Sequence, residues 1–322
     1  MFEVLSQIDN VKLNFGTEGK VILQMTIAFI MFGVALELKI EDFKRLFYTP
    51  KPVFIGIISQ FILMPLITFL IVIIIGAHIP VTIGLGMILV ASCPGGNISN
   101  FMSTLARGNI ALSVSLTAFS SIGGLLLTPF NFTFWGGLYM HFYENPGADG
   151  LVRNLQIDTW MVLQTLIILL GIPIILGLLF QHRFPDITLK IVKYIKAFSI
   201  LAFFSIVIIL FIKNYDLFLG YIRYIFFIVL FHNAAALSGG YTLGSIASLS
   251  KKDCKTISIE TGIQNSALAL ALLFDPAIFP ENIPVGGMAY IAGWWGLWHI
   301  VSGLTIASIW SGFSLRNISN EE

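Results

Sequence analysis

Residues 81–106 read VTIGLGMILVASCPGGNISNFMSTLA, an apolar run that breaks at Pro-Gly-Gly and resumes after a polar segment. Pro94 lacks an amide proton, and Gly95-Gly96 disfavour continued helix. The polar residues that follow are Asn97, Ser99 and Asn100. Asn97 is suited to cap a second helix. Because unsatisfied backbone groups are costly in lipid, we expect the break to be buried in protein or to line a cavity.

The rest of the chain is equally apolar. Of its 322 residues, 57% are hydrophobic and only 11% are charged, against about 25% in a typical soluble domain. The net charge is +1 and the sequence has no basic block, so nothing indicates a nucleic-acid partner. The composition therefore predicts an all-α, polytopic membrane protein that lies in a lipid bilayer.

Nine apolar runs are long enough to cross a bilayer, which takes about 20 helical residues. They lie at about 20–38, 52–75, 81–106, 109–135, 157–180, 191–212, 217–249, 255–275 and 285–313. The third and the eighth contain polar breaks, so each counts as one discontinuous span. The seventh is long, and we expect it to be tilted or interrupted at Gly239-Gly240.

The basic residues give an orientation for these spans. With the N-terminus outside, nine spans place 13 of the 18 Lys and Arg residues on the cytoplasmic side, as the positive-inside rule requires. We therefore expect a multi-pass protein of the cell (inner) membrane with a cytoplasmic C-terminus. The longest polar connection, about residues 138–156, divides four spans from five. This predicts one domain over 1–322, with inverted repeats at about 20–137 and 157–313.

The second break lies in the eighth span and reads ETGIQNS over residues 260–266. Glu260 is the only acidic residue well inside any apolar run. An intramembrane carboxylate is expensive to bury and usually has a function. Gly262 weakens the helix directly after it. Since one break occurs in each half at corresponding places, the pair indicates a transport site near the bilayer midplane.

Other polar side chains within the spans extend this hypothesis. Ser113 and Thr117 are four residues apart and share one helical face, and Gln60 lies in the second span. Carboxylate, amide, hydroxyl and carbonyl oxygens suit a hard cation better than a transition metal. The alternative is that these side chains only bond neighbouring helices. A structural role is likewise the more frequent one for histidines such as His232 and His299.

Both breaks resemble the signature regions of a known family. Residues 93–117, CPGGNISNFMSTLARGNIALSVSLT, and residues 257–269, ISIETGIQNSALA, resemble the bile acid:sodium symporter family and its Glu-x-Gly-x-Gln-Asn-Ser core. FIMFGVALELKIEDF, SQFILMP, VLFHNAA and LWHIVSG extend the resemblance over about residues 28–310. It implies two inverted repeats, a core and a panel domain, and two discontinuous helices that cross in the core. This chain resembles members that lack the first of ten helices, which agrees with nine spans.

The resemblance also implies ligands. Two Na⁺ ions would serve as coupling ions. The first would be held by Ser99, Asn100, Ser113, Thr117 and Glu260. The second would be held by Gln60, Glu260, Gln264 and the backbone carbonyls of Thr261 and Ile263. An organic anion would lie between core and panel, near Asn97, Ile98, Asn265 and His299.

We therefore expect a sodium-coupled symporter of an organic anion, bile-acid-like or a small carboxylate, that works by alternating access. Proton coupling through Glu260 is the first alternative. An intramembrane enzyme is a weaker one, because the sequence has no Gly-x-Ser-x-Gly or His-Glu-x-x-His motif. A sensor that binds an anion without moving it is the last. Nothing in the sequence indicates an obligate protein partner.

Overall fold

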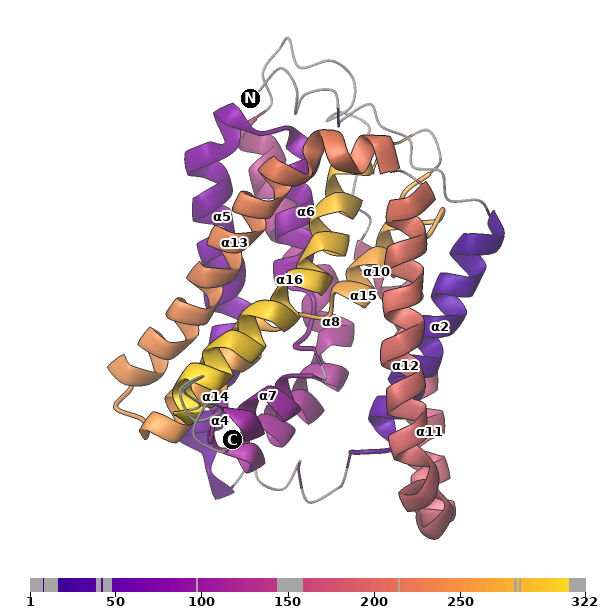
Figure 1. Cartoon of the computed structure of the whole chain (residues 1–322), viewed down its shortest axis with the longest axis vertical. Coiled ribbons are helices and arrows are strands. Elements are labelled where there is room, and N and C mark those ends of the chain that lie inside the picture. The colour runs from indigo at the N-terminus through magenta and orange to yellow at the C-terminus, as the bar shows by residue number, and fades with distance from the viewer. Residues whose placement is uncertain are drawn as a thin grey trace, which may run out of the picture.

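The computed structural model describes residues 8, 17–38, 42, 48–96, 98–143, 159–213, 215–280, 283 and 285–312, and within these ranges the elements are helices without strands (Figure 1). The first half contains α2 (Thr17–Ala35), α4 (Pro50–Ile58), a π-helical turn (Ser59–Leu63), α5 (Met64–Ile75), a 3₁₀ turn (Gly76–His78), α6 (Val81–Ser92), α7 (Ser99–Leu105) and α8 (Ile110–Phe142). The second half contains α10 (Thr159–Leu166), a π-helical turn (Ile167–Gly171), α11 (Ile172–Arg183), α12 (Pro185–Lys213), α13 (Tyr215–Ile246), α14 (Lys251–Gly262), α15 (Ser266–Leu273) and α16 (Gly286–Ser311). The expected all-α class is confirmed.

Within the described ranges, six helical stretches are long and apolar enough to cross a membrane. They are Glu18–Ala35, Pro50–His78, Ile110–Phe142, Thr159–Arg183, Pro185–Lys213 and Leu219–Ile246. Large apolar side chains on the outside, such as Ile74, Leu201 and Phe231, are more than half exposed, as expected for surfaces that face lipid. The fold is therefore that of a polytopic membrane protein. The count of nine spans stays a prediction, because α6, α7, α14 and α15 are each short and α16 is less apolar.

Helix α13 is continuous, so the expected interruption at Gly239-Gly240 is wrong. A Cβ atom at Gly240 would lie 2.9 Å from the Ile257 carbonyl oxygen and 2.9 Å from Ser258 Cα on α14. Glycine thus lets the backbones of α13 and α14 pack closely, as small residues do between membrane helices. Gly240 thus serves packing against the broken helix α14, whereas a Cβ atom at Gly239 would lie 2.6 Å from Ile67 Cδ1 on α5.

A π-helical turn and a proline shape the helix that carries Gln60. Pro65 has no amide proton to donate to the Phe61 carbonyl oxygen one turn earlier. Asn131 Nδ2 on α8 donates to that oxygen instead, at 2.9 Å. The neighbouring helix thus satisfies the backbone acceptor that Pro65 leaves open. The π turn over Ser59–Leu63 keeps both Ser59 and Gln60 buried, and such turns are frequent at functional sites.

The helices pack in two neighbourhoods (Figure 1). Helix α2 packs on α11 and α12, and these three lie together at one side of the molecule. Helices α6, α13 and α15 pack on α16, while α14 packs on α13 and α8. Both broken pairs, α6–α7 and α14–α15, belong to the second neighbourhood, so the breaks lie inside protein rather than at the lipid-facing surface.

Candidate functional site

The two breaks lie against each other and satisfy each other's backbone. The Gly96 amide donates to the Ile263 carbonyl oxygen at 2.7 Å, and the Asn265 amide donates to the Pro94 carbonyl oxygen at 2.9 Å. These bonds form an isolated antiparallel bridge between Gly95 and Gln264. Since no water replaces lost helical hydrogen bonds in a bilayer, each break supplies the partners that the other requires.

The helices that follow the two breaks begin differently. Asn265 Oδ1 accepts a hydrogen bond from the Leu268 amide at 3.1 Å, so its side chain caps α15. The residue at the N-cap position of α7 is Ile98, and among the described residues no side chain caps that helix. The expected cap, Asn97, lies outside the described residues, so it stays a prediction.

Glu260 lies at the last turn of α14 and is fully buried. Its Oε1 atom accepts hydrogen bonds from Ser99 Oγ at 2.7 Å and from Ser113 Oγ. Gln60 Nε2 lies 3.3 Å from Glu260 Oε2 and 3.1 Å from the Glu260 carbonyl oxygen. Side chains from the first half of the chain thus surround a carboxylate from the second half.

Oxygen atoms outnumber the available protons beside Glu260 Oε1. Ser113 Oγ also lies 2.8 Å from Asn100 Oδ1, and Thr117 Oγ1 lies 3.2 Å from the same amide oxygen. A hydroxyl has one proton, so Ser113 cannot donate to Glu260 and to Asn100 at once. One of the two oxygen contacts of Ser113 therefore has no proton, and converging carboxylate, amide and hydroxyl oxygens are the ligand types that a hard cation prefers.

A second group of oxygens comes from Gln60 and from the second break. Gln264 Nε2 donates to the Thr261 carbonyl oxygen at 2.9 Å, while the Ile263 carbonyl accepts the Gly96 amide. The buried Oε1 atoms of Gln60 and Gln264 have no hydrogen-bond partner within the described part of the chain. Because an unsatisfied buried acceptor costs about 1–3 kcal/mol, both amide oxygens fit the ligand set of a cation.

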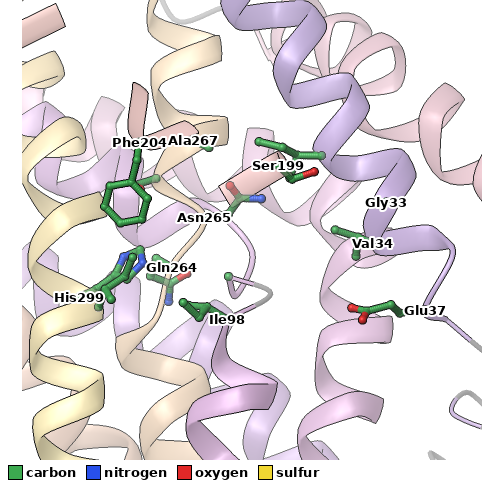
Figure 2. Close-up of a pocket in the computed structure, with 14 residues that line it drawn as sticks. Gly33, Val34, Glu37, Ile98, Ser199, Phe204, Gln264, Asn265, Ala267 and His299 are labelled. Atoms are coloured by element: carbon green, nitrogen blue, oxygen red, sulfur yellow. The ribbon is translucent and has the colours of Figure 1, made fainter. Parts of the chain in front are cut away.

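The expected anion-binding residues line one pocket (Figure 2). Ile98, Asn265 and His299 come from the two breaks and from α16, and residues of α2 and α12 also line the pocket. His299 is 6% exposed, and its Nδ1 atom has no partner among the described residues. The structure thus brings these three residues together beside the bridge, whereas the fourth, Asn97, falls outside the described ranges.

Several contacts were not predicted from the sequence. Ser59 Oγ lies 2.6 Å from Thr261 Oγ1, and Asn233 Nδ2 donates to the Gly262 carbonyl oxygen at 2.7 Å. Ser59 directly precedes Gln60, and Asn233 belongs to the quoted VLFHNAA segment, so polar residues within apolar runs were the available signal. His232 Nε2 lies 2.7 Å from Thr68 Oγ1, a contact between α13 and α5 that fits a structural histidine.

Six apolar spans and two interrupted helices that meet around a buried carboxylate define an integral membrane protein with a polar site inside the bundle. The profile of the Sodium Bile acid symporter family matches residues 24–221. The chain belongs to this family, which confirms the resemblance of the two motifs. Its members are transporters and not enzymes.

Curated relatives extend over most of the chain. It is 33% identical over 291 residues to the uncharacterized sodium-dependent transporter YocS of Bacillus subtilis (strain 168), covering 88% of this chain and 81% of that protein. It is 30% identical to the probable chloroplastic sodium/metabolite cotransporter BASS2 of Oryza sativa subsp. japonica, covering 76% of this chain and 55% of that protein. The human P3 protein is 30% identical, over 75% of this chain and 48% of its own length.

Proposed function

We propose that the protein is a sodium-coupled symporter of an organic anion that works by alternating access. The observation that carries this proposal is the fully buried Glu260, whose carboxylate contacts Ser99, Ser113 and Gln60 from the other half of the chain. A bound Na⁺ would neutralise the carboxylate and join the oxygens of both broken helices. The sodium-dependent relatives support the choice of this ion.

We assign two Na⁺ ions to the two groups of oxygens. The first would use Ser99, Asn100, Ser113, Thr117 and Glu260. The second would use Gln60, Glu260, Gln264 and the carbonyls of Thr261 and Ile263. The short oxygen contacts of Ser113 and the unpartnered amide oxygens of Gln60 and Gln264 support these two sets. Since Glu260 belongs to both, occupation of one site would affect the other.

The organic anion would bind in the pocket beside the bridge. Asn97, Ile98, Asn265 and His299 are the proposed contacts, and the N-terminus of α15 would offer backbone amides and a partial positive charge to a carboxylate or sulfonate. Ions and anion would stabilise the same arrangement of the two breaks. Thermodynamic linkage then requires that Na⁺ raises anion affinity and that the anion raises Na⁺ affinity by the same factor.

The proposed architecture follows from the apolar runs, the distribution of basic residues and the family resemblance. Nine spans form two inverted repeats within one domain over 1–322, with the N-terminus outside the cell (inner) membrane and the C-terminus in the cytoplasm. The panel would contain α2, α11 and α12, which pack together, and the core would contain both broken helices. Relative movement of panel and core would expose the pocket to each side in turn.

Flux measurements in proteoliposomes test the proposal. An inward Na⁺ gradient should drive accumulation of a transported anion, whereas a pH gradient at equal Na⁺ should not. Accumulation driven only by the pH gradient would favour proton coupling, for which the buried Glu260 is the supporting observation. Anion binding without any flux would favour a sensor and contradict the transport proposal.

A further inference from the structure

The pocket occupies only one end of the contact between panel and core. Gly33, Val34 and Glu37, at the C-terminal end of α2, line it (Figure 2). Ser199 of α12 also lines it, and Ala267, near the start of α15, is the last residue of that helix to do so. The rest of α15 is buried and packs on α2, α6 and α16. Panel and core thus have the pocket between them at the C-terminal end of α2 and are in direct contact toward its N-terminal end.

Buried apolar side chains fill the contact beyond the pocket. Leu23, Ile27 and Met31 recur every four residues along α2, and each is 1% exposed. Asn265 Nδ2 lies 3.7 Å from Met31 Sδ, so this row begins beside the bridge. The eight residues of α15 span about 12 Å at the helical rise of 1.5 Å per residue. A packed layer of about this thickness therefore separates the pocket from the far end of α15.

Asp275 joins core and panel at the far end of that layer. It follows α15, and its Oδ2 atom accepts a hydrogen bond from Thr165 Oγ1 on α10 at 3.0 Å and lies 3.5 Å from Gln24 Nε2 on α2. Helices α10 and α11 belong to one apolar stretch, Thr159–Arg183, so both donors come from spans assigned to the panel. The other oxygen, Oδ1, accepts from the Ala277 amide at 2.9 Å. One oxygen thus holds the turn after α15, and the other contacts the panel.

The end of α15 is an unfavourable place for a carboxylate without donors around it. The C-terminus of a helix carries a partial negative charge, which repels an acidic side chain. The turn uses a single oxygen of Asp275, and an asparagine side chain would supply that acceptor equally well. Among the described residues, the second oxygen contacts only the panel. The carboxylate therefore fits a contact between panel and core better than a device that stabilises α15.

We propose that Asp275, Thr165 and Gln24 form a latch that holds core and panel together on the outer side of the protein. This inference rests on the proposed function, because it takes panel and core to move and the N-terminal end of α2 to lie outside. The latch is closed in this structure. It opens when the pocket becomes exposed to the outside, and the three side chains then bond water instead. Hydrogen bonds to a charged group that exist in one arrangement only shift the equilibrium toward that arrangement.

Thiol labelling at the inner edge of the packed layer tests the latch. Met31→Cys places a thiol between the layer and the bridge, and the full chain carrying it is studied in right-side-out membrane vesicles. A charged, membrane-impermeant methanethiosulfonate added outside reaches this thiol when the outer side opens. The chain without the added cysteine gives the background from the buried residues Cys93 and Cys254. The labelling rate therefore reports the fraction of protein that is open to the outside.

Substitutions added to Met31→Cys assign the effect to the latch. Thr165→Val removes one donor with little change in shape and should raise the labelling rate about tenfold, as loss of one hydrogen bond to a charged group does. Asp275→Ala should raise it further, and Gln24→Leu, which removes the longer contact, should raise it less. Thr165→Ser keeps the hydroxyl and should label like the parent. Asp253→Asn is the matched control, because this carboxylate joins α14 to Asn109 at the start of α8 and not to the panel.

Three outcomes would overturn the latch. The first is labelling within about twofold of the parent in both Thr165→Val and Asp275→Ala. The second is an equal rise in Thr165→Ser and Thr165→Val, and the third is an equal rise in inside-out vesicles, since either would show loosened packing rather than opening to the outside. Failure of the proposed function is distinguishable from these. Absence of Na⁺-driven anion uptake by the unaltered chain would contradict symport, whereas unchanged labelling in a chain that takes up the anion would overturn the latch alone.

Discussion

The two breaks are built differently although they meet in one bridge. The helix after the second break, α15, is buried at every residue, and Asn265 caps it. The helix after the first break, α7, has no side-chain cap among the described residues, and Phe101 on it is 54% exposed. The second break also follows the buried carboxylate, whereas the first brings the Ser99 hydroxyl to that carboxylate and the Asn100 amide oxygen to Ser113. The difference indicates that the second break holds the Glu260 carboxylate in place, and that the first break supplies further polar groups around this carboxylate.

The largest expected effect comes from removing that charge. Glu260→Gln should reduce Na⁺-dependent uptake at least about 100-fold, because a cation without its buried counter-charge loses about 3–5 kcal/mol. Uptake into proteoliposomes measures the effect. Asp253→Asn is the control, since Asp253 lies in the first turn of the same helix and accepts hydrogen bonds from Ser250 and Asn109, away from the bridge. Undiminished stimulation of uptake by Na⁺ in Glu260→Gln would contradict the role of the Glu260 carboxylate as the counter-charge for Na⁺.

The next effect tests the contribution of the first break. A Cβ atom at Gly95 would lie 2.6 Å from Gln60 Nε2 and 3.3 Å from Glu260 Oε2. Gly95→Ala should therefore displace Gln60 and weaken Na⁺ binding by roughly 10- to 100-fold, as loss of a supporting contact does at a metal site. Gly137→Ala on α8, where nothing lies within 4 Å of the added atom, is the control. If a calorimetric titration gives equal Na⁺ affinities for both variants, the close approach of Gly95 to Gln60 is contradicted.

A smaller effect concerns the helix that carries the charge. Gly240→Ala would place a methyl group 2.9 Å from the backbone of α14, so α13 and α14 must separate. We expect a loss of about 1–3 kcal/mol in the free energy of unfolding, the usual cost of overpacking. Gly220→Ala, in the same helix but with open space around the added atom, should not lower stability. Thermal unfolding in detergent compares the two.

The smallest expected effect tests the cap that distinguishes the breaks. Asn265→Ala removes the acceptor for the Leu268 amide and should lower the free energy of unfolding by about 1 kcal/mol. Asn265→Ser keeps an oxygen at the cap and should retain most of that stability. If Ala and Ser give the same melting temperature, the cap does not stabilise the second break.

The sequence predicted both breaks because helix-breaking chemistry is local. Pro94 and the glycines end α6, Gly262 ends α14, and Glu260 stands out among apolar residues. The hydrogen bonds between the breaks depend on residues about 170 positions apart, so no local pattern contains them. The corresponding positions of the breaks in the two halves, and then the family resemblance, indicated one shared site but not these hydrogen bonds.

Other features could not be predicted for related reasons. Asn131 donates to the Phe61 carbonyl oxygen that cannot bond to Pro65, and this donor lies on another helix. Gly240 likewise allows close packing against another helix and does not interrupt its own. Glu37 and Ser199 reach the pocket only through the packing of α2 on α12. Such contacts follow from tertiary arrangement, which periodicity and composition do not specify.

Anomalous scattering from a heavy monovalent cation tests the central claim most directly. Crystals soaked in Tl⁺ as a substitute for Na⁺ should show a peak beside the Glu260 carboxylate, within coordinating distance of Ser113 Oγ, and Na⁺ should remove that peak in competition. Crystals of Glu260→Gln should lack it. A peak confined to other parts of the molecule, or one that persists in Glu260→Gln, would contradict the account of two broken helices joined by a cation.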